Sequence, residues 1–441
     1  MSFKKVLLSG LAAAALSTSV YAGGGAVSLE ADGTGDYLVF PNYFANTVNW
    51  QTNLKVVNTN STHSVIAKVV VRESRFSHEK LDFLIYLSPN DVWEGTLVDS
   101  GSGVVMTSSD PSTVFGGIPA SATAPHTVPL FAPKTYTRVN KTTVSENNAR
   151  GYVEVFAVAA SNSIVVIDGV NHDLGAHGVS KAAIYEAYRT GLGLWTSVEN
   201  DTLYGMAVIS GDNANGKLAM TYPAVAFNGV TGTGVPMTFA QAVATDSSFQ
   251  NNLTSTAVAT AVLSGIQDEL SKKATYATYY GGSTPDETVL LTNFLTKKYI
   301  SIFDKRDFFE ERAITDALAI LKAGALDLDA ETNWYLKYTV QPWDQEEHTP
   351  QGGEVSGGDT TIYTCEDEVC YLDVTATTPY GSGYSIYSFT GGMISDKADT
   401  PYIPQLMTAK KIGGVNVINI VYPQYVNGAN PLPYSVNNFT E

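Results

Sequence analysis

Cysteine is scarce, with two among 441 residues. A framework of several disulfides and a zinc site built from four cysteines are therefore excluded. Basic residues are also few: 26 Lys and Arg stand against 43 Asp and Glu, for a formal net charge of −17. Nucleic acid is a poor partner for such a chain, because its affinity depends on neutralising phosphates with Lys and Arg.

Catalytic motifs are missing as well. The chain has six His, and no G-x-S-x-G turn marks a nucleophile. Residues 211–218 approach a phosphate-binding loop, but Leu218 stands where the hydroxyl that binds Mg²⁺ is needed. A hairpin turn at Asn215-Gly216 is the preferred interpretation. We expect no enzyme; a secreted hydrolase acting on glycans is the alternative, since the separation of paired carboxylates is invisible in a sequence.

Long apolar runs are confined to the N-terminus and are short. Lys4 and Lys5 precede the apolar segment 6–16, and Val20-Tyr21-Ala22 offers small residues for cleavage. This pattern predicts a signal peptide over residues 1–22. No later stretch approaches about 18 unbroken apolar residues, so we expect no transmembrane segment in the mature chain. The expected location is extracellular or at the cell surface, with the periplasm as an alternative.

The first half of the sequence alternates between apolar and polar residues. Leu81, Phe83, Ile85 and Leu87 alternate with a second set that begins at Asp82, which predicts a strand with one buried face. Several such segments, separated by turn residues, predict a mainly β protein: an antiparallel β-sandwich, immunoglobulin-like, with helical insertions. Residues 163–168 are expected to form a strand, and 180–189 a helix.

Composition divides the mature chain near residue 235. We expect a β-sandwich domain over 23–235, in which the Ser-, Thr- and Pro-rich residues 99–150 form a long surface loop. Residues 236–441 are expected to be α+β, with helices near 256–274 and 308–323. This part either completes the same sandwich or forms a second one.

The two cysteines fit an exported protein. Cys365 and Cys370 flank four residues within the β-rich segment 360–375. A hairpin there would set the two cysteines opposite each other, close enough for a disulfide.

Two groups of residues offer weak metal ligands. The first group lies just beyond the predicted helix 308–323. Its acidic residues stand at every second position, as the oxygen ligands of a Ca²⁺ site can, although the EF-hand spacing is absent. The other group would suit Zn²⁺, but its histidines are five residues apart and do not share a helix face. Solvated loops are the preferred interpretation of both, so no cofactor is expected and Ca²⁺ is the alternative. The first group is Asp327, Asp329 and Glu331; the second is Asp168, His172, Asp173 and His177.

A run of charged residues between two predicted strands, over 72–82, carries Arg72, Glu73, Arg75 and Lys80. Ion pairs formed within the run, on a loop that pins the sandwich, are favoured over catalysis. Exposed pairs of this kind are worth about 0 to 1 kcal/mol each.

The same run carries a family resemblance. Residues 72–83 and 86–93 are similar to the blocks R-E-G-x-N-S-x-E-x-L-D-F and Y-L-S-P-x-D-V-W of a family of uncharacterised exported proteins of Gram-negative bacteria. Ser74 stands where the family usually has Gly, and Phe76 where it has Asn. The resemblance implies export, a surface setting and a β-rich fold, and it carries over no catalytic residue. Further similar blocks lie at 36–43, 151–155 and 296–299.

These features together predict an exported structural or adhesive protein of the cell surface, the extracellular matrix or a filament. Its partners would be further copies, joined by strand addition from the tail 23–35, or surface glycans and proteins. The 25 tyrosines suit glycan stacking as well as sandwich cores. The alternatives are a secreted glycan-binding module or hydrolase and, second, an outer-membrane-associated protein.

Overall fold

The computed structural model describes most of residues 27–244 and mainly the strands of the rest. The described ranges are 27–46, 50–137, 143–171, 180–213, 216–231, 235–244, 266, 269, 271–272, 274–280, 287–293, 336–344, 362–365, 369–373, 382–390, 403–404, 406–412 and 419–422. The protein is mainly β with antiparallel sheets, so the prediction of a β-sandwich is confirmed.

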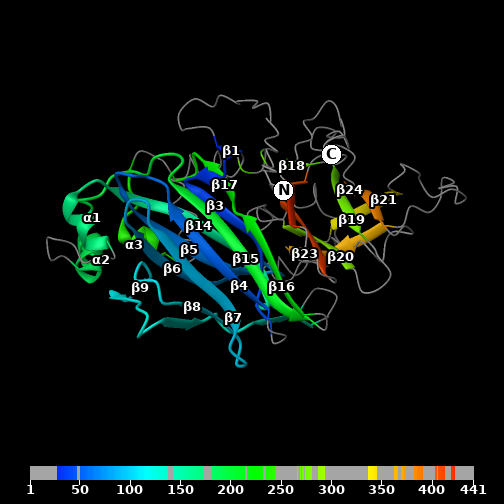
Figure 1. Cartoon of the computed structure of the whole chain (residues 1–441), viewed down its shortest axis with the longest axis horizontal. Helices are drawn as coiled ribbons and strands as arrows, with labels where there is room; N and C mark the ends of the chain where they lie inside the picture. The colour runs from blue at the N-terminus through cyan, green and yellow to red at the C-terminus, as the bar shows by residue number, and fades with distance from the viewer. Residues whose placement is uncertain are drawn as a thin grey trace, which may run out of the picture.

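The sandwich is built from two large sheets (Figure 1). Sheet A has the strand order β1 (Ser28–Glu30), β17 (Val225–Asn228), β3 (Tyr37–Phe44), β14 (Arg150–Ser161), β5 (Ser64–Glu73) and β6 (Glu79–Leu87). Sheet B has the order β11 (His126–Pro129), β8 (Val104–Ser108), β7 (Val92–Asp99), β4 (Gln51–Asn58), β15 (Leu203–Asn213) and β16 (Gly216–Pro223). β15 and β16 pair antiparallel with Asn213 opposite Gly216, so the predicted pairing of two strands is confirmed, whereas Gly216 belongs to β16 and not to the turn.

The main core lies between the two sheets. Alternate residues of β5 and β6, among them Val69 and Phe83, meet Leu54 and Trp93 from sheet B. The Trp93 indole Nε1–H donates to Thr113 Oγ1 at 2.7 Å, so its polar atom is satisfied within the core. The predicted inner faces of these strands are therefore correct.

The outer face of sheet A is buried too, beneath α1 (Ile164–Val170), α2 (Lys181–Thr190) and α3 (Phe239–Ala242), which gather at one end of the sandwich (Figure 1). The expected helix at 180–189 is confirmed, and Ser180 caps it by accepting from Ala183 N at 3.2 Å. The strand expected at 163–168 is wrong, because this segment is α1. Val166 and Val170, four residues apart, share a helix face and pack onto sheet A, which outweighs their β preference.

The expectation that 99–150 forms a surface loop is also wrong in part. This segment supplies β8 and β11 to sheet B, and the short strands β9 (Val114–Phe115), β10 (Ile118–Pro119), β12 (Thr135–Thr137) and β13 (Thr143–Ser145). Val104, Met106 and Leu130 are buried in the main core, and their burial offsets the weak strand preference of the Ser- and Gly-rich flanks.

The tail 23–35 is predicted to add a strand to another copy, but part of it pairs with strands of its own chain. β1 pairs with β17 at one edge of sheet A, and β2 (Thr34–Gly35) pairs with β15 of sheet B. Val27 and Leu29 join the apolar layer on the outer face of sheet A. Donating this tail to another copy would therefore require these pairings to break first.

The second half contributes two four-stranded sheets, beyond β16 in Figure 1. One has the order β19 (Ala274–Tyr280), β24 (Ser382–Thr390), β21 (Leu336–Asp344) and β22 (Ile362–Cys365); the other has β23 (Val369–Asp373), β20 (Glu287–Asn293), β26 (Leu406–Ile412) and β27 (Asn419–Tyr422). β18 (Ser271–Lys272) pairs with β25 (Ile403–Pro404). Within the predicted helix 256–274, residues 266 and 269 are helical but 271–272 form β18. The predicted helix 308–323 lies outside the described residues.

The strands that carry the cysteines belong to different sheets. Cys365 is opposite Leu336, whereas Cys370 is opposite Thr292. The predicted hairpin over 360–375 is therefore wrong, because β22 and β23 each pair with a strand distant in sequence and not with each other. No disulfide is present among the residues that the structure describes.

Two hydrogen bonds join the second half to sheet A. Asn293 Nδ2 donates to Pro41 O at 2.9 Å, and Val369 N donates to Ser74 O at 2.8 Å. Asn293 and Val369 are register partners in one sheet, so a single strand pair makes both contacts. Among the described residues, no helix combines the length and the apolar character needed to cross a membrane.

Candidate functional site

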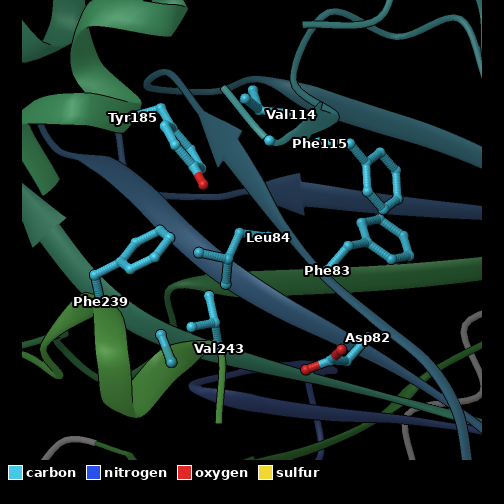
Figure 2. A pocket seen from close by; sticks show the side chains of 10 residues that line it. Asp82, Phe83, Leu84, Val114, Phe115, Tyr185, Phe239 and Val243 are labelled. Atoms are coloured by element: carbon cyan, nitrogen blue, oxygen red, sulfur yellow. The ribbon is translucent and has the colours of Figure 1, made fainter. Parts of the chain in front are cut away.

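A hollow of about 160 Å³ lies at the edge of sheet A, where the helices meet β6. Figure 2 shows Tyr185 and Phe239 on one side of it, Phe83 and Phe115 on the other, and Leu84 between them. Its walls therefore come from β6, β9, α2 and α3, which are far apart in the sequence. The remaining lining residues are Asp82, Val114, Gly116, Ala242 and Val243.

Aromatic rings form most of the wall. The rings of Tyr185 and Phe239 meet edge to face at 5.3 Å, and those of Phe83 and Phe115 lie 5.2 Å apart. Gly117 approaches the Tyr185 ring so closely that a Cβ at this position would lie 3.3 Å from the ring, and its φ is +83°. Glycine thus lets the loop after β9 close against α2.

The charged group among the lining residues is the Asp82 carboxylate, and Tyr185 adds a hydroxyl group (Figure 2). Lys68 Nζ lies 2.6 Å from Asp82 Oδ2 and also donates to Ala244 O at 2.7 Å. The Lys68 side chain is fully buried, whereas the Asp82 side chain is 26% exposed. The carboxylate therefore faces the hollow with its charge balanced from behind and its position held by a partner that cannot move into water.

A buried ion pair lies on the same face of sheet A. Arg72 pairs with Glu154, and both side chains are almost fully buried. Glu154 also accepts from Tyr37 Oη at 2.7 Å, and Arg72 Nη1 donates to Ser77 O at 3.2 Å. Every one of these contacts joins strands or their connecting turn, so the pair fixes the strands to one another.

Two more buried carboxylates organise the turn after β5. Glu73 accepts from the backbone N–H of Arg75, Phe76, His78 and Asn147, at 2.6 to 3.3 Å. Burial nevertheless raises the pKa of the Glu73 carboxyl above its ordinary value, against the lowering effect of these four bonds.

Glu146 is held by side chains as well as by backbone. His78 Nδ1 lies 2.7 Å from one carboxylate oxygen, while Lys80 Nζ and Lys134 N donate to the other. Burial by itself raises the pKa of the Glu146 carboxyl, but the bonds from His78, Lys134 and Lys80, with the Lys80 charge, lower it to about 2.

The expectation of exposed ion pairs confined to the run 72–82 is therefore wrong for Arg72 and Lys80. Arg72 and Lys80 are buried, and they pair with Glu154 and Glu146, from distant parts of the chain. Glu73 accepts mainly from backbone N–H groups, a role that sequence spacing does not reveal. The run does pin the sandwich, as expected, but through buried contacts.

The described part of the structure contains one acidic cluster that is not among the residues predicted as metal ligands. Carboxylate oxygens of Glu30, Asp32 and Asp201 lie within 4.8 Å of one another. Asp32 and Asp201 are exposed, and their oxygens already accept from Thr34 N at 3.0 Å and Asn228 Nδ2 at 2.6 Å. With these donors in place, the cluster gives no indication of a resident cation, and no sequence signal links residues so far apart.

The predicted metal ligands are not brought together in the described part of the chain. Asp168 lies in the last turn of α1 and is half-buried. The other predicted ligands lie outside the described residues: His172, Asp173, His177, Asp327, Asp329 and Glu331.

Sheet B turns a regular polar row outward. The register places Val208 beside Asn53, then Thr96, Thr107 and Thr127, across five strands. Asn53 Nδ2 donates to Thr96 Oγ1 at 3.1 Å, and the hydroxyls of Thr107 and Thr127 are 3.3 Å apart. Together these residues present hydroxyl, amide and methyl groups at the strand spacing.

No family model and no curated protein matches this chain.

Proposed function

We propose that this is an exported structural or adhesive protein of the cell surface, matrix or a filament, and that it binds through the outward face of sheet B. The N-terminal signal pattern supports export. The resemblance of residues 72–83 and 86–93 to exported proteins supports a surface setting.

The observation that carries the proposal is the contrast between this face and the charge of the whole protein. The formal net charge is −17, yet Lys55 and Glu94 pair with each other in the row beside the threonines. An uncharged partner is not repelled by the net charge, but it must displace water from the groups that it covers. That displacement costs less over uncharged residues and the paired Lys55 and Glu94 than over unpaired carboxylates. Hydroxyl and amide groups at regular spacing suit a hydroxyl-rich surface polymer, which we infer to be the partner.

The buried charges support a role without catalysis. Glu154, Glu146 and Glu73 each accept bonds that hold strands and turns together. In the hollow, Asp82 is the one carboxylate among the lining residues, whereas glycoside hydrolysis uses two.

The test is adhesion of the purified mature protein to surfaces coated with neutral polysaccharide and to whole cells. Thr96→Glu and Thr107→Glu place charge on the outward face of sheet B, and we expect each to lower retention at least about tenfold. Thr190→Glu, on exposed α2 at the opposite side of the sandwich, is the matched control and should bind as the wild type does. A wild type that binds neither surface, or equal retention of all three variants, contradicts the proposal.

Export would place Cys365 and Cys370 in an oxidising compartment, and a disulfide between them is proposed on that ground alone, since β22 and β23 do not pair with each other. Alkylation of the secreted protein, with and without prior reduction, tests it by mass. Modification of both thiols without reduction contradicts it.

A further inference from the structure

We infer that the hollow between β6, β9, α2 and α3 is a binding site for a small uncharged aromatic ring with one hydroxyl group, that is, a phenol. This goes beyond the proposed adhesive role and rests on a different surface of the molecule. Three features of the hollow support it: its size, the chemistry of its walls and the way Asp82 is held.

The size fits one ring. An apolar cavity of about 150 Å³ in another protein holds benzene, and the hollow here measures about 160 Å³. Tyr185 and Phe239 meet edge to face, so a third ring can add to the arrangement with the same favourable geometry. Leu84, Val114 and Val243 complete an apolar surround for the ring.

The Asp82 carboxylate selects the hydroxyl group. Lys68 balances its charge at 2.6 Å, so the site gains little from a cationic ligand. A neutral O–H can still donate to the carboxylate in a charge-assisted hydrogen bond, which is stronger than a bond between neutral groups. Because Lys68 is fully buried and also bonded to Ala244 O, Asp82 is already in place before the ligand arrives.

The same walls disfavour a sugar. A hexose would bring several hydroxyl groups into the hollow, whose lining side chains offer two hydrogen-bonding groups, the Asp82 carboxylate and the Tyr185 hydroxyl, among apolar walls. Each hydroxyl buried without a partner costs free energy. The hollow therefore favours a ring with one polar group over a ring with many.

Ligand-observed saturation-transfer NMR on the full mature chain tests this inference with three probes: phenol, toluene and a methyl hexoside. We expect phenol to bind with a dissociation constant of about 1 mM, as suits so small a ligand, and about tenfold more tightly than toluene, which lacks the hydroxyl. Comparing ligands leaves Asp82 unchanged, so Lys68 keeps its partner.

A variant places the binding in the hollow. Val243 is 43% exposed at the hollow, and Val243→Phe should fill it and abolish the phenol signal. Val235→Phe is the matched control, because Val235 is 64% exposed and does not line the hollow. Phenol binding unchanged by Val243→Phe, toluene binding as tightly as phenol, or tighter binding of the hexoside would each overturn the inference. Thr96→Glu should leave phenol binding intact, which separates this site from the adhesive face.

Discussion

Sheets A and B share one core but differ in what covers their second face. All ten residues of β5 in sheet A are buried, whereas β4 in sheet B alternates between buried and more exposed positions. Helices and the start of β23 cover the outer face of sheet A, while the structure describes no layer over the outward face of sheet B. The difference shows that one alternating pattern can serve a half-buried or a fully buried strand, depending on its neighbours.

Charge behaves differently on the two sheets for the same reason. Arg72 and Glu154 lie in sheet A with at most 1% of either side chain exposed, whereas Lys55 and Glu94 in sheet B keep 35% and 50%. Water screens the second pair and stabilises each partner alone, so its loss costs little. Neither partner of the first pair can be solvated if the other is removed.

The largest expected effect is the difference in stability lost when the cation of the buried pair and the cation of the exposed pair are each removed. Arg72→Leu leaves the Glu154 carboxylate buried without the Arg72 charge, although Tyr37 Oη still donates to it, so we expect a loss of about 3 to 5 kcal/mol in the free energy of unfolding. Lys55→Leu should cost less than about 1 kcal/mol. Urea unfolding followed by tryptophan fluorescence measures both. Equal losses would break the comparison, and adding Glu154→Met to Arg72→Leu should recover part of the lost stability.

The second-largest expected effect is a loss of unfolding free energy in acid, which arises where Glu146 contacts the end of sheet A. The pKa of Glu146 is lowered from 4.5 to about 2, so the folded state holds this proton less tightly than the unfolded state does. Its contribution is present above pH 4.5 and is lost as pH falls toward about 2, by about 3 kcal/mol. Unfolding free energies measured across this range should fall less steeply in Glu146→Gln. Glu94→Gln, on sheet B, is the control and should keep the wild-type slope.

A smaller effect is expected from shortening one apolar side chain on the outer face of each sheet, and the loss of unfolding free energy should be greater in sheet A than in sheet B. Val70 on the outer face of sheet A is fully buried, and Val70→Ala should cost about 2 kcal/mol. Val208 on the outward face of sheet B is half-buried, and Val208→Ala should cost about 0.5 kcal/mol. Thermal and urea unfolding of both variants give the comparison. A larger loss at Val208 would mean that sheet B is covered as well.

The smallest expected effect is on the threonine row. Thr96→Glu should change the free energy of unfolding by less than about 0.5 kcal/mol, because Thr96 is half-buried and faces outward. The same urea titration measures it. A loss above about 2 kcal/mol would show that this face is packed against something in the folded protein.

Local patterns predicted several elements correctly. The alternation around Val69 and Phe83 identified strands and their inner faces, and the antiparallel pairing of β15 with β16 followed from the turn residues expected between them. Where the prediction failed, a distant contact decided the outcome. Residues 163–168 became a helix because sheet A offered Val166 and Val170 an apolar face, and 99–150 gained strands because sheet B had an open edge.

The candidate site was the least predictable part. The sequence contains Asp82, Tyr185 and Phe239, but they are separated by up to 157 positions, and only packing brings them around one hollow. The residues predicted as metal ligands were chosen because they are neighbours in the sequence. Sites formed across elements depend on topology, which local spacing does not report.

By itself, the sequence determined the class of fold and one face of each main strand, because alternation along a strand is a local property of the backbone. The tertiary structure alone decided which second faces are covered, which carboxylate each buried cation meets and where the aromatic rings converge. These outcomes depend on pairing between residues far apart in the chain, and the free energy of each pairing exists only once the sheets have assembled.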